Sequence, residues 1–147
     1  MKILSLLFLT LFLGKGCNSN ADQDINTAVI EYVANTRGFY QKISIEKKAV
    51  TVSKDRTGKE KVQSTKISDR DWKELIKLFE EVNLEELKDL KSPTEKRFYD
   101  GAAIANLKIT YKGTTYETPS FDHGFPPFEV KKIVTKINSF VKQDDED

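Results

Sequence analysis

Apolar residues recur along this chain with two different periods, and this change of period restricts the fold more than any other feature. Several short segments alternate apolar and polar residues, which is typical of strands with one buried face. One central segment instead has its apolar residues at helical spacing, at Trp72, Leu75, Ile76, Phe79 and Val82. The sequence therefore predicts a single α+β domain.

Six strands are predicted from the alternating segments and from the turn residues between them. They cover residues 27–34, 39–45, 49–54, 61–67, 103–111 and 114–118. Lys112 and Gly113 form a tight hairpin turn between the last two. The fourth segment is polar on both faces, so we expect it at an edge of the sheet.

Two helices complete the predicted domain. Ser68, with Asp71 three residues later, resembles a capping box at the start of the first helix. The last helix follows Pro126 and Pro127, and its apolar stripe consists of Val130, Ile133, Val134, Ile137 and Val141. The order ββββ-α-ββ-α, with short links, predicts an antiparallel sheet of about six strands with both helices on one face.

The first 16 residues have the features of a secretory signal. Lys2 precedes an apolar run from residue 3 to residue 13, which is too short to span a bilayer as a helix. Cys17, the single cysteine, follows Gly16 directly. This arrangement resembles a lipoprotein cleavage site and predicts a lipid on Cys17, although Leu13 is one position too early and Lys15 is unusual there. The alternatives are ordinary signal cleavage near Gly16 and an unmodified Cys17.

The predicted organisation follows from this leader. Residues 1–16 are a signal peptide, 17–25 a polar tether, 26–142 the single domain and 143–147 an acidic tail. The whole chain has 24 basic and 23 acidic side chains. Removing Lys2 and Lys15 with the leader changes the net charge from +1 to −1. A near-neutral exported chain gives no reason to expect a nucleic acid partner.

The hairpin turn brings two irregular segments together. If Lys112 and Gly113 are the turn, the numbers of paired residues sum to 225, so that Ala105 faces Ser120 and Ala102 faces His123. The loop entering the hairpin then lies beside the loop leaving it. The candidate binding residues in these two loops are Arg97, Tyr99, Asp100, Phe121, Asp122 and His123.

Several chemistries are open to this loop cluster. His123, oriented by Asp122 or Asp100, could act as a general base, but Ser120 lacks a nucleophile elbow and no catalytic residue is assigned. One histidine and no spare cysteine exclude the usual zinc sets, and the cluster lacks the acidic ladder of a calcium loop, so no metal or cofactor is expected. The carboxylates could instead cap backbone amides, with the phenylalanines filling the sheet end. The cluster could also bind a small ligand or another envelope protein.

The leader, the lone Cys17 and residues 100–127 (DGAAIANLKITYKGTTYETPSFDHGFPP) together resemble a group of small lipoproteins of flavobacteria and other Bacteroidota. The resemblance covers most of the exported chain and implies location rather than activity. It implies attachment to a bacterial membrane through Cys17, with the outer membrane favoured and the domain in the periplasm or at the cell surface. The expected function is a non-catalytic binding or interaction module of the envelope. The alternative is a small envelope hydrolase using Asp100, Asp122 and His123.

Overall fold

A computed structural model describes residues 24–141 of the chain. The predicted signal peptide, Cys17 and the acidic tail at 143–147 lie outside the described residues. Ile25, which the sequence assigns to the tether, is buried and belongs to the short helix η1 (Ile25–Thr27). The side chain of Asp24 caps this helix by accepting a hydrogen bond from the backbone N–H of Asn26.

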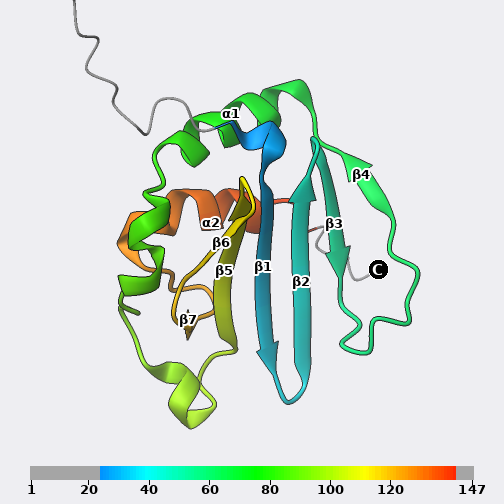
Figure 1. The fold of residues 1–147 in the computed structure, drawn as a ribbon. Helices are drawn as coiled ribbons and strands as arrows, with labels where there is room; N and C mark the ends of the chain where they lie inside the picture. The colour runs from blue at the N-terminus through cyan, green and yellow to red at the C-terminus, as the bar shows by residue number, and fades with distance from the viewer. Residues whose placement is uncertain (1–23, 142–147) are drawn as a thin grey trace, which may run out of the picture.

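The described residues form an α+β fold with one antiparallel sheet, as the sequence predicts (Figure 1). The strands are β1 (Val29–Thr36), β2 (Phe39–Glu46), β3 (Ala49–Ser53), β4 (Ser64–Lys66), β5 (Ile104–Tyr111), β6 (Thr114–Glu117) and β7 (Phe121–Asp122). They lie in the order β4-β3-β2-β1-β5-β6, and β7 pairs with β5 beyond the end of β6. β4 lies at an edge, as predicted, but it is shorter than the predicted strand at 61–67.

Two α-helices pack against one face of this sheet (Figure 1). They are α1 (Asp69–Glu80) and α2 (Lys131–Asn138), and the 3-10 helices η2 (Leu84–Asp89), η3 (Lys96–Tyr99) and η4 (Phe128–Val130) occupy the connections. The predicted cap of α1 is confirmed, because Ser68 Oγ accepts a hydrogen bond from the backbone N–H of Asp71 at 3.2 Å. None of the helices in residues 24–141 combines the length and apolar character needed to cross a membrane.

The core lies between the helices and the facing side of the sheet. Alternate residues of the long strands are buried there, including Ile30, Tyr32, Ile43, Leu107 and Ile109. The helices contribute the predicted apolar stripes, with Trp72, Leu75 and Phe79 from α1 and Ile133, Val134 and Ile137 from α2. The other side of the sheet is polar: Glu31 on β1 pairs with Lys42 on β2 and Lys108 on β5.

The direction of β1 places the start of the described chain and η3 at opposite ends of the sheet. β1 leads away from η1, and Asn35 near its end pairs with Ile104 at the beginning of β5. Since η3 leads into β5, it lies at the end of the sheet where β1 finishes (Figure 1).

Candidate functional site

The two predicted loops do lie side by side, but the register between them differs from the prediction by one residue. Near the turn, Tyr111 pairs with Thr114 and Lys108 with Glu117, as expected. Farther along, Ala105 pairs with Phe121 rather than Ser120. The backbone N–H of His123 donates to the carbonyl of Ala103 rather than pairing with Ala102. The predicted register beyond residue 118 is therefore wrong.

Thr118 and Pro119 explain this shift. The hydroxyl of Thr118 accepts a hydrogen bond from the backbone N–H of Leu107, a role that a backbone carbonyl would otherwise have. Pro119 has no N–H to continue the ladder, and proline inside a sheet is usual at such irregularities. One extra residue therefore fits between Thr118 and Phe121, as in a β-bulge. As a result, Phe121 joins the core beside Ala105, and Asp122 lies opposite Ile104.

Asp122 is the structural centre of the loop cluster. Its side chain is fully buried and accepts four hydrogen bonds from the segment before β5. The donors are the hydroxyl of Thr94 at 2.5 Å, the backbone N–H groups of Lys96 and Arg97 at 2.7 and 3.0 Å, and Arg97 Nη1 at 3.1 Å. Burial acts to raise the pKa of this carboxyl, but the hydrogen bonds from Thr94, Arg97 and Lys96 outweigh it and lower the pKa to about 2.

Arg97, which lies on η3, adds further hydrogen bonds to those that Asp122 accepts. Only 10% of its side chain is exposed, and its Nη1 also donates to Ser92 Oγ and to the carbonyl of Thr94. Its Nε is buried with no hydrogen-bond partner among the described residues. The guanidinium group lies over the ring of Phe98, 4.3 Å from its centroid. Arg97 thus contacts both the exposed ring of Phe98 and the buried carboxylate of Asp122.

His123 is held by the core rather than by the neighbouring carboxylates. Its Nδ1 lies 2.7 Å from the hydroxyl of Tyr32, and its ring packs against the rings of Tyr32 and Phe39. Burial lowers the pKa of His123 and raises that of Tyr32. In this arrangement, a neutral imidazole with its proton on Nε2 accepts a hydrogen bond at Nδ1 from the hydroxyl of Tyr32. His123 therefore fastens the segment after β7 to the middle of β1.

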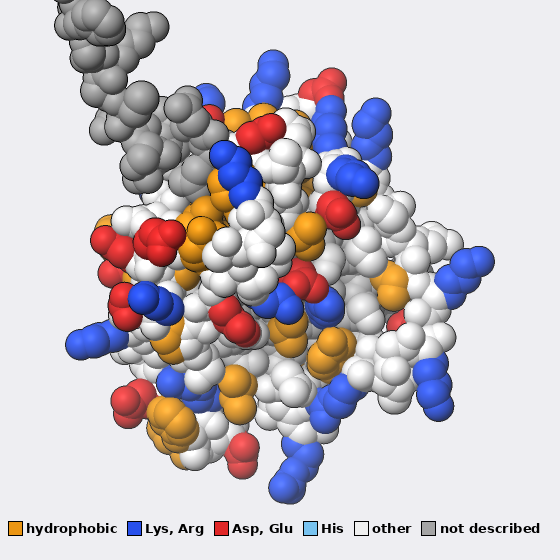
Figure 2. Space-filling view, in the orientation of Figure 1, with side chains coloured by type: hydrophobic (Ala, Val, Ile, Leu, Met, Phe, Trp, Pro, Cys, Tyr) orange, Lys and Arg blue, Asp and Glu red, His pale blue; other side chains and the backbone are white. Residues whose placement is uncertain are grey.

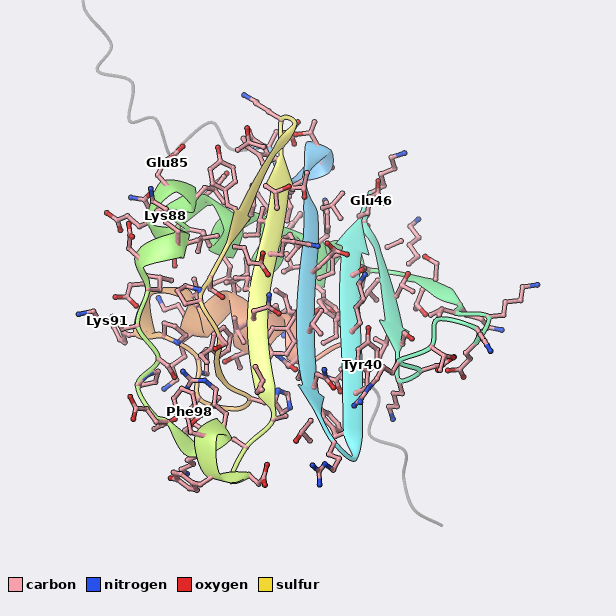
Figure 3. The ribbon with its side chains drawn as sticks, turned by 60° about the horizontal axis from the view of Figure 1, so that its bottom comes forward. Tyr40, Glu46, Glu85, Lys88, Lys91 and Phe98 are labelled. Atoms are coloured by element: carbon pink, nitrogen blue, oxygen red, sulfur yellow. The ribbon has the colours of Figure 1, made fainter. Side chains whose placement is uncertain are left out.

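Phe98, Tyr99, Ile104 and Phe125 are exposed apolar side chains beside this framework, and we call these four residues the η3 surface. Phe98 and Tyr99 are each 71% exposed, Ile104 is 51% exposed and Phe125 is 42% exposed. Figure 3 shows Phe98 on η3, at the end of the sheet, and Figure 2 shows hydrophobic side chains gathered at that end. The Nζ of Lys96 lies 4.1 Å from the ring centroid of Phe125. Aromatic rings beside cations in an ordered loop are typical of a contact surface for another molecule.

The predicted site residues therefore separate into two groups. Arg97, Phe121, Asp122 and His123 are buried or half-buried and build the framework. Tyr99 and Asp100 are exposed, and Asp100 ends η3 in the left-handed conformation. Within residues 24–141, the ring of His123 is not hydrogen-bonded to Asp100, Asp122 or Ser120. In the same part of the chain, no group of three or more histidine, cysteine or acidic residues is placed to hold a metal ion.

Two residues essential to this geometry are absent from the predicted site. Thr94 donates a hydrogen bond to Asp122, which is 28 residues farther along the chain, and Tyr32 is hydrogen-bonded to His123, which is 91 residues farther along. Tyr32 carried one usable signal, because it places a hydroxyl on the buried face of an otherwise apolar strand and such a hydroxyl needs a partner.

No known protein family, curated protein or solved structure matches this chain.

Proposed function

We propose that this protein is a lipid-anchored binding protein of the bacterial cell envelope, with the η3 surface as its contact site. The observation that carries the proposal is the contrast within η3. Its backbone is held by the buried carboxylate of Asp122, while the adjoining side chains of Phe98 and Tyr99 are each 71% exposed. The fold therefore presents two large aromatic rings to solvent on a well-ordered segment.

Such an arrangement favours binding for two physical reasons. Covering exposed aromatic area with a partner removes it from water, and each ring has a large apolar area to contribute. A segment already held by hydrogen bonds also loses less conformational entropy when it binds than a loose loop would. Aromatic side chains are enriched among the residues that dominate binding energy in protein interfaces. These considerations support another envelope protein as the partner.

The position of the η3 surface agrees with a lipid on Cys17. The tether between Cys17 and the first described residue, Asp24, can span at most about 24 Å. A domain held so closely has the end that carries η1 near the membrane, and the η3 surface lies at the opposite end of the sheet (Figure 1). The proposed contact site would then face away from the anchor and towards other envelope components.

The hydrolase alternative has less support. A general base needs a carboxylate or another group that orients it towards a nucleophile. The ring of His123 is instead paired with Tyr32, and both carboxylate oxygens of Asp122 accept hydrogen bonds from residues 94–97.

Site-specific photocrosslinking in the lipidated chain tests the binding proposal. A photoreactive residue at Tyr99 should give a discrete crosslinked envelope protein, whereas one at Phe128 should not. Phe128 is the matched control because it is an aromatic residue, 87% exposed, outside the η3 surface. The double variant Phe98→Ser/Tyr99→Ser should recover at least about tenfold less of that protein, with unchanged thermal stability. Equal crosslinking at both positions, or equal recovery with the double variant, would refute the η3 surface as the contact site.

A further inference from the structure

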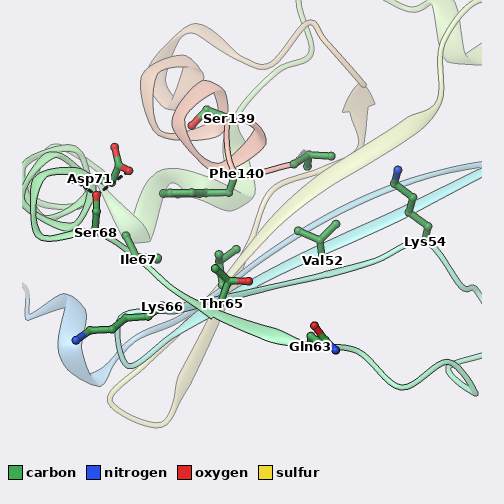
Figure 4. Close-up of a pocket in the computed structure, with 12 residues that line it drawn as sticks. Val52, Lys54, Gln63, Thr65, Lys66, Ile67, Ser68, Asp71, Ser139 and Phe140 are labelled. Atoms are coloured by element: carbon green, nitrogen blue, oxygen red, sulfur yellow. Dashed lines mark hydrogen bonds between the residues drawn. The ribbon is translucent and has the colours of Figure 1, made fainter. Parts of the chain in front are cut away.

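The end of α2 separates a surface pocket from a polar contact inside the fold. Ser139 and Phe140, which follow the helix, line a pocket of about 530 Å³ beside β3 and β4 (Figure 4). Asn138, the last residue of α2, instead accepts a hydrogen bond at Oδ1 from Nε2 of the buried Gln41, at 3.2 Å. Its Nδ2 donates to the carbonyl of Val134 at 2.9 Å. Because a carbonyl can only accept, these two contacts fix which end of the Asn138 amide is the donor.

The hydrogen bonds continue from Asn138 through Tyr32 to His123. Burial raises the pKa of the fully buried Tyr32 hydroxyl, and a hydrogen bond from the side chain of Asn138 partly offsets this effect. A hydrogen bond that lowers the pKa of a phenol is one donated to its oxygen. The single hydroxyl proton of Tyr32 is then directed to Nδ1 of His123, which lies 2.7 Å away. All the donors face the same way along this chain, and the chain ends on an unprotonated ring nitrogen.

A proton on His123 is incompatible with this order. A charged imidazole carries N–H groups on both ring nitrogens, so Nδ1 could no longer accept from Tyr32. The hydroxyl of Tyr32 has no hydrogen-bonding neighbour other than Asn138 and His123 within residues 24–141, so its proton would lose its acceptor. A buried donor without an acceptor costs free energy, and so does a charge removed from water. The packed arrangement therefore requires a neutral His123.

No charged neighbour among the described residues compensates for this conflict. The ring of His123 packs against Tyr32 of β1 and Phe39 of β2, and burial alone lowers its pKa. The charged side chains of the surrounding segments have partners of their own or are exposed. They are Asp122, bonded to residues 94–97; Arg56, bonded to the carbonyls of Thr36 and Phe39; Lys96, on the ring of Phe125; and the exposed Arg37 and Asp100.

We propose that His123 is an acid-sensitive latch, whose protonation breaks the hydrogen bond to Tyr32 and releases residues 123–125 from β1. The ring is only half-buried, so it reaches water by turning outward. Gly124 follows with a φ of 89°, and glycine allows the backbone to change conformation at this point. The released segment contains Phe125, so acid would also weaken contacts at the η3 surface. This last consequence rests on the proposed function.

The direction of the pH effect follows from linkage. The packed ring has a lowered pKa, whereas a released ring in water has the ordinary value of 6.5, so the released form takes up the proton first as the pH falls. The latch is closed above about pH 7 and opens as the pH falls towards about 5. Asp122, with a pKa of about 2, stays ionised over this interval, so the support of η3 is not lost at the same time.

Nuclear magnetic resonance of the exported chain carrying Cys17→Ser tests the latch. His123 is the only histidine, so its ring signals are unambiguous. At about pH 7.5 the ring protons of His123 should show nuclear Overhauser effects to the ring of Tyr32. These effects should disappear with the midpoint at which the ring becomes protonated, while those between the rings of Phe79 and Tyr111 persist. A fully protonated ring that keeps its contacts with Tyr32 would overturn the proposal.

His123→Asn is the matched control variant, because its amide oxygen replaces Nδ1 as an acceptor and does not titrate. The amide of Phe125 donates to the carbonyl of Asp122 at 2.9 Å and reports on the released segment. Its protection from hydrogen exchange, corrected for the intrinsic rate, should fall at least about tenfold between about pH 7 and pH 5 in the wild type and stay constant in His123→Asn. Equal losses in both proteins would show that acid loosens the segment by another route.

Tyr32→Phe tests the donor conflict itself. Removing the hydroxyl removes the donor that His123 must accept, so the midpoint of ring protonation should rise by at least about 0.5 pH unit. An unchanged midpoint would contradict the assignment of the conflict to Tyr32.

Photocrosslinking from Tyr99 connects the latch to the partner. The crosslinked envelope protein should decrease at least about threefold from about pH 7 to pH 5 in the wild type, and should not depend on pH in His123→Asn. Crosslinking in the wild type that does not change with pH would overturn the regulatory role. No crosslink at either pH would refute the η3 surface as the contact site, and the ring measurements would still decide whether the latch exists.

Discussion

Asp122 shows how one buried charge can organise a surface. Two of its four hydrogen bonds come from backbone N–H groups of η3, so this carboxylate determines where Phe98 and Tyr99 are presented. Charged hydrogen bonds of this kind are stronger than neutral ones, and they are costly to break when they are buried. The residue that the sequence offered as a catalytic partner of His123 thus has a positioning role in the structure.

Replacement of Asp122 by asparagine should therefore destabilise the domain. The neutral amide could not balance the charge of Arg97, whose side chain is only 10% exposed, and the expected loss is about 3 kcal/mol of unfolding free energy. Urea denaturation followed by Trp72 fluorescence would measure it. Asp55→Asn is the matched control, because Asp55 also accepts several backbone hydrogen bonds but lies in an exposed loop; its effect should be much smaller. Equal losses in both variants would contradict the role given to Asp122.

The same carboxylate makes stability depend on pH. Its pKa is lowered from the ordinary value of 3.8 to about 2 in the folded protein, so the unfolded chain takes up a proton first as the pH falls. The stabilisation is complete above about pH 4 and is lost as the pH falls towards 2, by about 2 kcal/mol. The stability difference between the wild type and Asp122→Asn should shrink over that interval. A difference that stays constant down to pH 2 would show that the carboxylate is not specifically stabilised.

At the scale of elements, the turn between β2 and β3 places two lysines in a backbone conformation that residues with side chains disfavour. Lys47 and Lys48 form this two-residue turn, and both have positive φ, at 48° and 61°. Turns of this type favour asparagine followed by glycine, because a side chain in the left-handed region is strained. The β5–β6 turn has glycine at its second position, Gly113, with φ of 78°.

The double variant Lys47→Asn/Lys48→Gly should therefore stabilise the domain by about 1 kcal/mol. It loses the ion pair between Lys48 and Asp69, but an exposed pair contributes little. Chemical denaturation at pH 7 would measure the gain. The control Lys59→Asn/Lys61→Gly makes the same exchanges in a loop where neither lysine has positive φ, and it should not stabilise. A loss of stability in the hairpin variant would mean that these lysines have a structural role beyond the turn.

At the scale of the whole molecule, the proposed anchor and the folded domain should be separable. Cys17 precedes the described fold by seven positions, so replacing it should not alter the packing of residues 24–141. We expect Cys17→Ser to move the protein from the membrane fraction to the soluble fraction, because the lipid supplies the membrane affinity. The control Asn18→Ser should remain membrane-bound. Retention of Cys17→Ser in the membrane with the same melting temperature would refute the anchor.

The sequence by itself determined the order of the six predicted strands and two helices, the apolar face of the long strands and of both helices, the cap at Ser68 and the edge position of β4. These features depend on local hydrophobic period and turn residues, which are readable without knowledge of distant contacts. The sequence did not predict β7, which lies in a segment that the sequence indicates as irregular. The hairpin turn also sufficed to predict that the segment around Arg97 lies beside the segment around Asp122, and their ion pair confirms it.

Only the tertiary structure decided the register beyond Thr118, the burial of Asp122 and the pairing of His123 with Tyr32. Each depends on atoms from segments far apart in the chain. The extra residue beside Pro119 is accepted because Phe121 then packs in the core and Asp122 reaches the donors of residues 94–97. A local pattern indicates which apolar residues face the core, but the folded chain determines their partners and which polar residues are buried with them.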